Sequence, residues 1–448
     1  MKKEIKTPIR DFVESYIERD VSRFHMPGHK GRGALGIEGY DITEIAGADS
    51  LYSPEGIIAE SESIAGEIFG ALTHYSTEGS SHAIRAMVYL TALLATKNGE
   101  RCRILAGRNA HKTFLSALAL VDAEVEWIPT SGVSYLSCGI DTEELRHILS
   151  GGGYTAVYVT TPDYLGGTLD VRAVADVAHS FGVPLLVDNA HGAYLKFLPE
   201  SRHPIDLGAD MCADSAHKTL PVLTGGAYLH ISKSAPDLFS DRAVEALSLF
   251  GSTSPSYLTL VSLDAANAYI EDGYRARLAE FCSAVSAVKS KISLHGFTVV
   301  PTEPLKITIA PKSFGYSGSE LADILRTSGI ECEFSDPDYT VLMLTPSLDT
   351  RDLERLEASL ASLEKKSAII DTPPVIRASS PAISPRSAIL SPSERVSAKD
   401  ACGRILASLT VSCPPAVPIV ALGEMVGETA IEAFRYYGID EVTVIKES

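Results

Sequence analysis

Between about residue 101 and residue 231, short runs of apolar residues alternate with amphipathic segments. The apolar runs are typical of buried strands: RCRILAG, AEVEWIP, TAVYVTTP, VPLLVDNA, DMCADSA and GGAYLHIS. Three segments between them have apolar residues at helical spacing: HKTFLSALALVDA, DTEELRHILSGGG and DVRAVADVAHSFG, the last closed by Gly182. Strands that alternate with helices form βα units, so the pattern predicts a parallel sheet with helices on both faces.

A second, smaller α/β pattern follows this sheet. It predicts strands over VVPTEPLKITIAP, IECEFSD and YTVLMLTPS and a helix over SGSELADILRTSG. Residues 366–400 are rich in Pro and Ser, which favours a linker on the surface. Beyond it we expect a helix over ACGRILASL, a stretch interrupted by prolines, and a final helix and strand.

Composition narrows the possible partners. The 448 residues carry 39 Lys and Arg against 57 Asp and Glu, a net charge of −18 that disfavours nucleic acid and anionic membranes. The seven cysteines form no CxxC pair, which argues against a disulfide framework or a zinc site. The N-terminus shows no signal peptide, and no apolar run reaches the roughly 18 residues of a membrane span. We therefore expect a cytoplasmic protein.

Two motifs look functional but lack the right context. Gly31 to Gly36 match GxGxxG, yet the preceding RFHMPGHK is polar and contains a proline, so no strand leads into the motif. His25 and His29 have the spacing of a metal pair on a helix, but Pro27 and Gly28 between them prevent a regular helix. We expect no metal site.

The sequence Ala-His-Lys-Thr occurs twice, with Lys112 and with Lys218, and only one copy has a partner carboxylate. Asp188 ends the apolar run VPLLVD, where a buried carboxylate is costly unless it is paired. Lys218 lies thirty residues later, in SAHK ahead of the flexible TGG. In parallel sheets ligands bind at the carboxyl ends of strands. A lysine that forms a Schiff base and an aspartate that pairs with a pyridine nitrogen are what pyridoxal 5′-phosphate requires, so we choose Lys218. The alternatives are a capping aspartate and a solvated loop lysine.

A phosphate site and a stacking residue complete the candidate set. Ser80 and Ser81 stand in a Gly-Ser-Ser turn at the start of a long helix, where backbone N–H groups and hydroxyls favour an anion. A plain N-cap is the alternative for Ser80. His111 follows the strand RCRILAG, and its ring is placed either to stack on a cofactor or to cap the next helix.

These residues resemble the Orn/Lys/Arg decarboxylases of fold type I, and more narrowly the shorter bacterial members without an N-terminal wing domain. The motifs of the resemblance run through nearly the whole chain: HMPGHKGRG, DITEIAGADSLYSPEG, GSSHAIRAM, RNAHKT, TTPDYLGGTLD, VDNAHG, DSAHKTL, GSTSPSY, GIECEF, ISPRSA and CGRI.

The resemblance implies an α/β fold. Its parts are an N-terminal arm (1–20), an aminotransferase-like large domain with a mostly parallel sheet that binds pyridoxal 5′-phosphate (21–265), a small α/β domain (266–365), the Pro/Ser-rich linker (366–400) and a C-terminal α+β domain (401–448). It also implies decarboxylation of arginine, lysine or ornithine to agmatine, cadaverine or putrescine.

The resemblance further implies a role for individual residues. Lys218 forms the Schiff base beside His217, Asp188 pairs with the pyridine nitrogen, Ala190 packs under the ring and His111 stacks on its other face. Three serines bind the phosphate: Ser80, Ser81 and Ser215. Ser252 and Thr253 reach the phosphate region of a neighbouring subunit, which makes a homodimer the smallest unit, and Glu333 contacts the distal amino or guanidinium group.

The chain departs from the family pattern at two places, and other activities stay open. Glu78 replaces the usual Asn before Gly79, and CPPAVP and ALGE replace the usual YPPGIP and PGE, with changes at Cys413, Ala416 and Ala421 or Leu422. An aminotransferase or carbon–carbon lyase would share the cofactor residues. An aminotransferase also needs an arginine for the α-carboxylate, and neither Arg326 nor Arg351 lies in a convincing motif. A non-catalytic protein that binds pyridoxal phosphate is the third alternative.

Overall fold

The computed structural model describes residues 6–129, 134–137, 139–376, 381–409 and 417–447. The chain forms two compact units. Unit 1 comprises Met1–Cys102, Tyr154–Tyr158 and Val171–Ala276, and unit 2 comprises Arg103–Gly153, Val159–Asp170 and Arg277–Ser448.

The larger sheet has seven strands in the order β1-β7-β6-β5-β4-β2-β3, and β4 (Ala156–Thr160) has residues in both units. The pairs β5–β6 and β2–β3 are parallel, whereas β7 runs antiparallel to both β6 and β1. The prediction of a mostly parallel α/β sheet is therefore confirmed. Every residue of β5, β6 and β7 is buried, so these strands are covered on both faces. This explains why their sequences do not alternate between apolar and polar residues.

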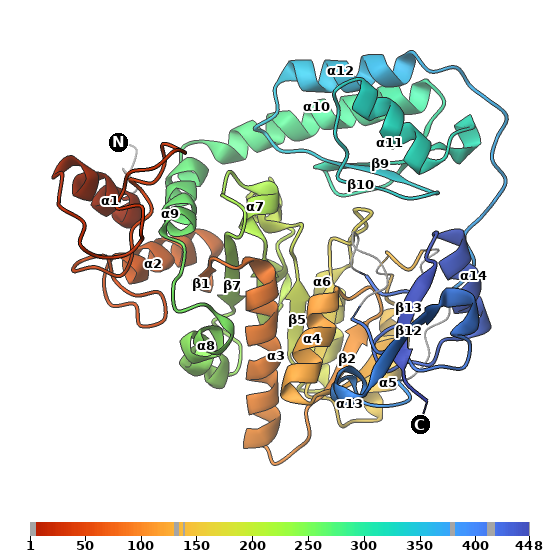
Figure 1. Ribbon diagram of the computed structural model, residues 1–448, viewed down its shortest axis with the longest axis horizontal. Helices are drawn as coiled ribbons and strands as arrows, with labels where there is room; N and C mark the ends of the chain where they lie inside the picture. Colours follow the sequence, from red (N-terminus) through yellow and green to blue (C-terminus); the bar gives the residue numbers. More distant parts are fainter. Residues whose placement is uncertain (1–5, 130–133, 138, 377–380, 410–416, 448) are drawn as a thin grey trace. The chain divides into compact units, whose positions relative to one another are not determined.

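Unit 1 contains four complete strands of the larger sheet, the start of β4, and several helices. Its elements, besides the start of β4, are α1 (Pro8–Glu18), α2 (Ile57–Phe69), β1 (Leu72–Ser76), α3 (Gly79–Lys97), α6 (Val171–Ser180), β5 (Leu185–Asp188), η1 (Ala193–Phe197), η2 (Pro204–Leu207), β6 (Met211–Asp214), α7 (Ala216–Thr219), β7 (Ala227–Ile231), α8 (Asp237–Phe250), α9 (Tyr257–Glu271) and the start of α10 (Tyr274–Leu294). Helices α3 and α8 pack side by side in this unit (Figure 1).

Unit 2 contains β2, β3 and the end of β4 from the larger sheet, together with two smaller sheets. Its elements, besides the ends of β4 and α10, are β2 (Arg103–Gly107), α4 (Lys112–Val121), β3 (Glu124–Ile128), α5 (Thr142–Ser150), β8 (Thr298–Val300), β9 (Lys306–Ala310), η3 (Pro311–Phe314), α11 (Gly318–Thr327), β10 (Phe334–Ser335), β11 (Thr340–Met343), α12 (Thr350–Ala361), α13 (Pro385–Leu390), β12 (Ser393–Ser397), η4 (Ala398–Asp400), α14 (Glu428–Tyr436) and β13 (Glu441–Ile445). An antiparallel sheet has the order β10-β11-β9-β8, and β12 pairs with β13.

The expected helix over ACGRILASL is wrong. In residues 401–409 the chain is extended or turned, with isolated bridges from Ile405 to Met425 and from Leu406 to Val444. Gly403 has a φ of +79°, which breaks a helix, and the Leu406 amide donates to the Glu424 carbonyl at 2.9 Å. Backbone groups of residues 401–409 form hydrogen bonds with other segments, and these bonds outweigh the helical preference indicated by the spacing of the apolar residues.

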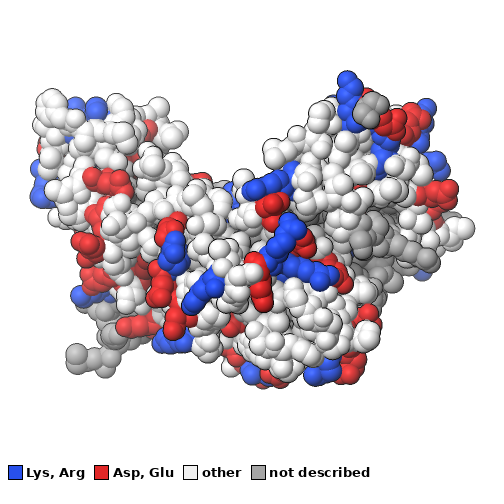
Figure 2. Space-filling model, turned by 90° about the horizontal axis from the view of Figure 1, so that it is seen from below, with Lys and Arg blue, Asp and Glu red and all other residues white. Residues whose placement is uncertain are grey.

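Smaller differences concern lengths and boundaries. The expected single strand over VVPTEPLKITIAP is two strands, β8 and β9, and Lys218 lies in the one-turn helix α7 rather than at a strand end. The Pro- and Ser-rich stretch 366–400 contains α13 and β12 as well as irregular segments. The domain boundaries stay a prediction. Among the described residues, no helix is both long and apolar enough to cross a membrane. On the face drawn in Figure 2, acidic and basic side chains are interspersed.

Candidate active site

Two neighbouring parallel strands of unit 1 end at the candidate site. Asp188 is the last residue of β5, and it lies opposite Ala213, the second-to-last residue of β6. Ser215 follows β6 directly, and α7 then carries His217 and Lys218. The sequence-predicted residues Asp188 and Lys218 therefore come from the same edge of the sheet, where ligands of parallel sheets bind.

Asp188 is a buried carboxylate that accepts hydrogen bonds from two donors. It is 2% exposed, accepts a hydrogen bond from the Ala190 amide at 3.1 Å, and accepts one from the Tyr158 hydroxyl at 3.3 Å. Burial raises its pKa, while the Lys218 charge and these two donors lower it in part. A cationic group beside Asp188 would offset the cost of burial, which suits a protonated pyridine nitrogen.

Lys218 and His217 lie side by side in α7 and have different partners. The Lys218 Nζ is 2.9 Å from Nε2 of His191, a buried residue of the loop after β5. Nδ1 of His217 donates to the Gly226 carbonyl at 2.9 Å, and burial lowers the pKa of His217. The His217 ring is therefore held with its proton on Nδ1, which leaves Nε2 as the basic nitrogen.

The start of α3 has the features of an anion site. Gly79 is the first residue of α3, so Ser80 and Ser81 lie in its first turn, where the N–H groups have no partner within the helix. Ser80 is not the N-cap, because Glu78 occupies that position. The Ser215 hydroxyl donates to the Ser80 hydroxyl at 2.8 Å, so the structure brings together two of the three serines expected to bind phosphate.

The TGG segment connects this helix start to α7. The Gly79 amide donates to the Gly225 carbonyl at 2.7 Å, and the His217 amide donates to the Gly226 carbonyl at 3.1 Å. Gly225 has a φ of +97°, and a Cβ there would lie 2.7 Å from the Thr77 carbonyl oxygen. Glycine is required at this position, because both the backbone conformation and the close approach exclude a side chain.

Glu78 binds the loop that carries Ser252 and Thr253. Both residues are exposed and lie between α8 and α9. The Ser252 amide donates to the Glu78 carboxylate at 2.6 Å, so this extra carboxylate has a hydrogen-bond donor within its own chain. The approach of Ser252 and Thr253 to a neighbouring subunit stays a prediction.

Unit 2 holds the remaining predicted residues. His111 is the N-cap of α4, just after β2, and its Nδ1 accepts from the Thr113 amide at 3.2 Å. Glu333 is exposed and accepts from the Tyr164 hydroxyl at 3.3 Å. Lys112 opens α4. Their roles toward a cofactor or substrate stay predictions, and Cys413 and Ala416 lie outside the described residues.

Sequence reasoning missed several side chains around the site. His191 stands in the quoted DNAHG motif, so its position after β5 was a usable signal. Asn189 stands in the same motif and had the same signal, whereas Tyr158 had none, since its contact joins two separate strands. Asp214 ends β6 as Asp188 ends β5, and the rule that singled out Asp188 would have found it as well.

The two motifs set aside above have structural roles. His25 and His29 lie outside helices: Nε2 of His25 is 2.7 Å from the Tyr16 hydroxyl, and Nε2 of His29 is 3.1 Å from the Asp41 carboxylate. The Gly31–Gly36 stretch contains turns and no strand or helix.

The family model for Orn/Lys/Arg decarboxylases, major domain, matches residues 7–308. The chain belongs to this family. It is 30% identical to the arginine decarboxylase of Bacillus subtilis over 95% of this chain and 92% of the relative. It is 31% identical to the arginine decarboxylase of Halalkalibacterium halodurans over 97% of this chain and 94% of the relative. It is therefore an amino-acid decarboxylase.

Solved structures support the fold of this decarboxylase. The constitutive lysine decarboxylase of Escherichia coli matches 98% of this chain and 82% of its own chain, with a TM-score of 0.77 and 17% identity. The lysine decarboxylase LdcF of Francisella novicida gives a TM-score of 0.81 at 17% identity over 99% of this chain and 82% of its own. A NifS-like protein gives a TM-score of 0.55 at 14% identity over 80% of this chain and 96% of its own. The aminotransferase-like fold is confirmed.

The arginines weighed for an aminotransferase are engaged at the surface of this decarboxylase. Arg326 pairs with Asp323 at 2.6 Å and with Glu331 at 3.2 Å, and Arg351 pairs with Asp349 at 2.8 Å. Both side chains are more than half exposed, at 55% and 85%. Their surface ion pairs do not favour a role in binding an α-carboxylate.

Proposed function

We propose that the chain decarboxylates a basic L-amino acid with pyridoxal 5′-phosphate bound at Lys218. The observation that carries the proposal is the convergence of Lys218 and the buried Asp188 at the ends of two adjacent parallel strands. Family membership supports the reaction class. The names of the relatives favour arginine as the first substrate to test, with lysine and ornithine beside it.

The residues present fit the cofactor at each of its polar ends. Ser80, Ser81 and Ser215 would hold the phosphate, with the first-turn amides of α3 as further donors. Asp188 would pair with the pyridine nitrogen, and Ala190 and His111 would flank the ring. When bound, pyridoxal phosphate supplies the electron sink that takes up the electron pair left by departing carbon dioxide.

Proton transfer in the proposed reaction falls to α7. Lys218 would supply the amine that holds the cofactor in the absence of substrate. His217, with its proton fixed on Nδ1, keeps Nε2 for exchange, and either His217 or Lys218 returns a proton to the substrate α-carbon. Asp188 would pair with the cofactor cation, and Glu333 would contact the distal amino or guanidinium group.

We further propose a homodimer as the smallest active unit. Several large apolar side chains of the N-terminal segment are exposed, including Phe24 at 96% and Leu35 at 79%, which supports a partner surface there. Ser252 and Thr253 would reach the phosphate region of the partner. One chain has a mass of 47.8 kDa, and light scattering on the purified protein should give twice this mass or a higher multiple. A monomer at micromolar concentration would contradict this part of the proposal.

A product screen tests the proposed reaction. Purified protein with pyridoxal phosphate is given arginine, lysine, ornithine and a panel of other amino acids, and mass spectrometry looks for each matching amine. We expect agmatine, cadaverine or putrescine from one of the three basic substrates. A keto acid instead of an amine would mean transamination and would refute the decarboxylase assignment.

The Lys218→Ala variant tests the site itself. It should lose both the visible absorbance band of the bound cofactor and amine production, because Lys218 is the amine whose charge acts on Asp188 in the proposed site. Lys112→Ala is the matched control, since it changes the lysine of the other Ala-His-Lys-Thr copy and should keep both signals. Turnover in Lys218→Ala at the parent rate would overturn the choice of lysine.

A further inference from the structure

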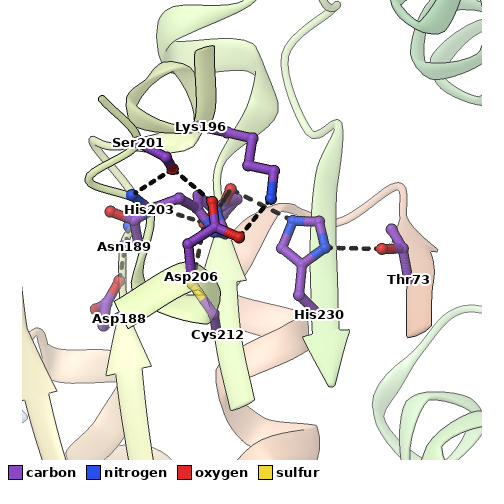
Figure 3. Close-up of polar contacts among 11 residues, drawn as sticks. Thr73, Asp188, Asn189, Lys196, Ser201, His203, Asp206, Cys212 and His230 are labelled. Carbon is purple, nitrogen blue, oxygen red and sulfur yellow. Dashed lines mark hydrogen bonds and ion pairs between the residues drawn. The ribbon is translucent and has the colours of Figure 1, made fainter. Parts of the chain in front are cut away.

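A fully buried carboxylate, Asp214, is the last residue of β6. Figure 3 shows side chains of the surrounding polar network, among them Asn189, His203 and His230. The Asp214 side chain is 0% exposed. Its Oδ2 is 2.9 Å from Nε2 of His203 and 3.4 Å from Nε2 of His230. Its Oδ1 accepts from the Asn189 amide group at 2.7 Å and from the Cys212 thiol at 3.2 Å. Four side chains from different parts of unit 1 thus converge on one carboxylate.

A neutral His230 ring fits this arrangement, with Asp214 as an anion. Nδ1 of His230 is 2.9 Å from the Thr73 hydroxyl, which donates to it when the ring proton sits on Nε2. Burial lowers the pKa of His230, which favours the neutral ring. Burial alone would raise the pKa of Asp214, but His203 and His230 hold it well below its usual range.

Asp214 and Asp188 lie on opposite faces of the same sheet edge. Asp188 pairs with Ala213, and Asp214 is the next residue along β6, so its side chain points to the other face. Asn189 joins the two: it follows Asp188, its amide donates to the Ala213 carbonyl at 3.0 Å, and its side chain binds Asp214.

The loop after β5 has little freedom to move Asn189. A Cβ on Gly192 would lie 2.0 Å from Oδ1 of Asn189, so only glycine leaves room for this side chain. Asp188 itself faces two further polar groups, the cation of Lys218 on α7 and the hydroxyl of Tyr158 on β4, and both lower its pKa. The Asp214 charge acts in the opposite direction, because like charges favour protonation.

We propose that Asp214 is a positioning residue for Asp188: it holds the end of β5 through Asn189 and keeps a fixed negative charge behind Asp188. This proposal rests on the proposed function, because it concerns the group that Asp188 pairs with. The fixed charge strengthens the hold of Asp188 on a proton shared with the pyridine nitrogen, and it favours every positive charge on the bound cofactor. His203 and His230 keep Asp214 ionised in the core.

Asp214→Asn tests the proposal on the holoprotein without substrate. The variant keeps the shape of the side chain and removes its charge. When the visible absorbance of the bound cofactor is titrated with pH, the midpoint should lie about one pH unit below that of the parent protein. This is the size of effect expected from removing one nearby charge in a protein interior. The control is Asp206→Asn, which removes a neighbouring carboxylate paired with Lys196 at 2.6 Å, and it should leave the midpoint unchanged.

A second variant covers the case in which Asp214→Asn does not fold. Asn189→Ala leaves the buried charge and removes the bridge, and it should weaken pyridoxal phosphate binding by at least about fivefold, one kcal/mol or so in hydrogen-bond energy. Parent-like affinity in this variant would overturn the positioning role, as would an unshifted midpoint in Asp214→Asn.

Two further outcomes are distinguishable. A parent protein that never develops a visible band with pyridoxal phosphate would overturn the proposed function and this proposal together. One equivalent of zinc retained by the parent protein after dialysis would instead make His203, Asp214 and His230 metal ligands and would overturn the positioning role alone.

Discussion

Replacing Arg108 by methionine removes the cation that pairs with the buried carboxylate of Glu424. Arg108 follows β2 and is 7% exposed, and Glu424 is 2% exposed. The Arg108 guanidinium donates to the Glu424 carboxylate at 2.9 Å, to the Pro418 carbonyl at 2.8 Å and to the Ile419 carbonyl at 3.0 Å. It therefore ties the ALGE segment near the C-terminus to the RNAHKT segment that carries His111.

The cost of Arg108→Met follows from these contacts. Breaking a buried ion pair on one side costs about 3–5 kcal/mol, because the remaining charge stays in the core without its partner. Two buried carbonyls also lose donors, at roughly 1–3 kcal/mol each when no water replaces the arginine. Methionine keeps part of the contact with Trp127, whose ring lies 5.1 Å from the guanidinium carbon. We expect a loss near the lower sum of these ranges, about 5 kcal/mol.

A double-mutant cycle in urea separates the ion pair from the carbonyl contacts. Glu424→Gln and the combined variant complete the cycle with Arg108→Met. If the pair is ionised and buried as described, the combined variant should recover about 1.5–3 kcal/mol relative to the sum of the single changes. A loss under about 1 kcal/mol in Arg108→Met, or additive single changes, would refute the reasoning.

Three other predictions follow from single contacts. Burial raises the pKa of Asp264 to about 6. The stability that its protonated form contributes is therefore complete below the ordinary pKa of 3.8 and is lost as the pH rises through about 6. The unfolding free energy of Asp264→Asn should vary less with pH over this window than that of the parent, and equal pH slopes of the two proteins in urea titrations would contradict this. Gly225→Ala should cost about 1–3 kcal/mol, because its φ is +97° and the new Cβ meets the Thr77 carbonyl, whereas Gly99→Ala, at a φ of +73° in open space, should cost less in the same denaturation assay. Glu78→Gln should tighten pyridoxal phosphate binding a few-fold, roughly 0.3–1 kcal/mol, since it removes a negative charge from the start of α3; an unchanged dissociation constant from absorbance titration would show that the Glu78 charge is screened.

The sequence predicts the large sheet well because its signals are local. The apolar runs that become β4, β5 and β6 are short and almost entirely buried, and strands of a parallel sheet buried on both faces have this pattern. The rule that ligands bind at the carboxyl ends of such strands then selects Asp188 and Lys218 without knowledge of their contacts.

The errors occur where partners distant in the sequence decide the structure. Residues 401–409 have apolar residues at helical spacing, yet Gly403 and bonds to the Glu424 and Val426 backbone keep them extended. The segment pattern contains no record of these partners, which lie more than fifteen residues away. Tertiary hydrogen bonds override a weak local preference here.

Asp214 shows what a local reading of a site leaves out. Asp188 and Asp214 both end buried strands, and the same cost of burial applies to each. They differ in what lies opposite: Asp188 faces the lysine, whereas Asp214 faces two histidines from a loop and from β7. The partner of a buried carboxylate decides its role, and sheet pairing supplies that partner. A strand-end aspartate in the sequence therefore predicts a charged site, while the pairing of β5, β6 and β7 decides that one aspartate faces Lys218 and the other faces the two histidines.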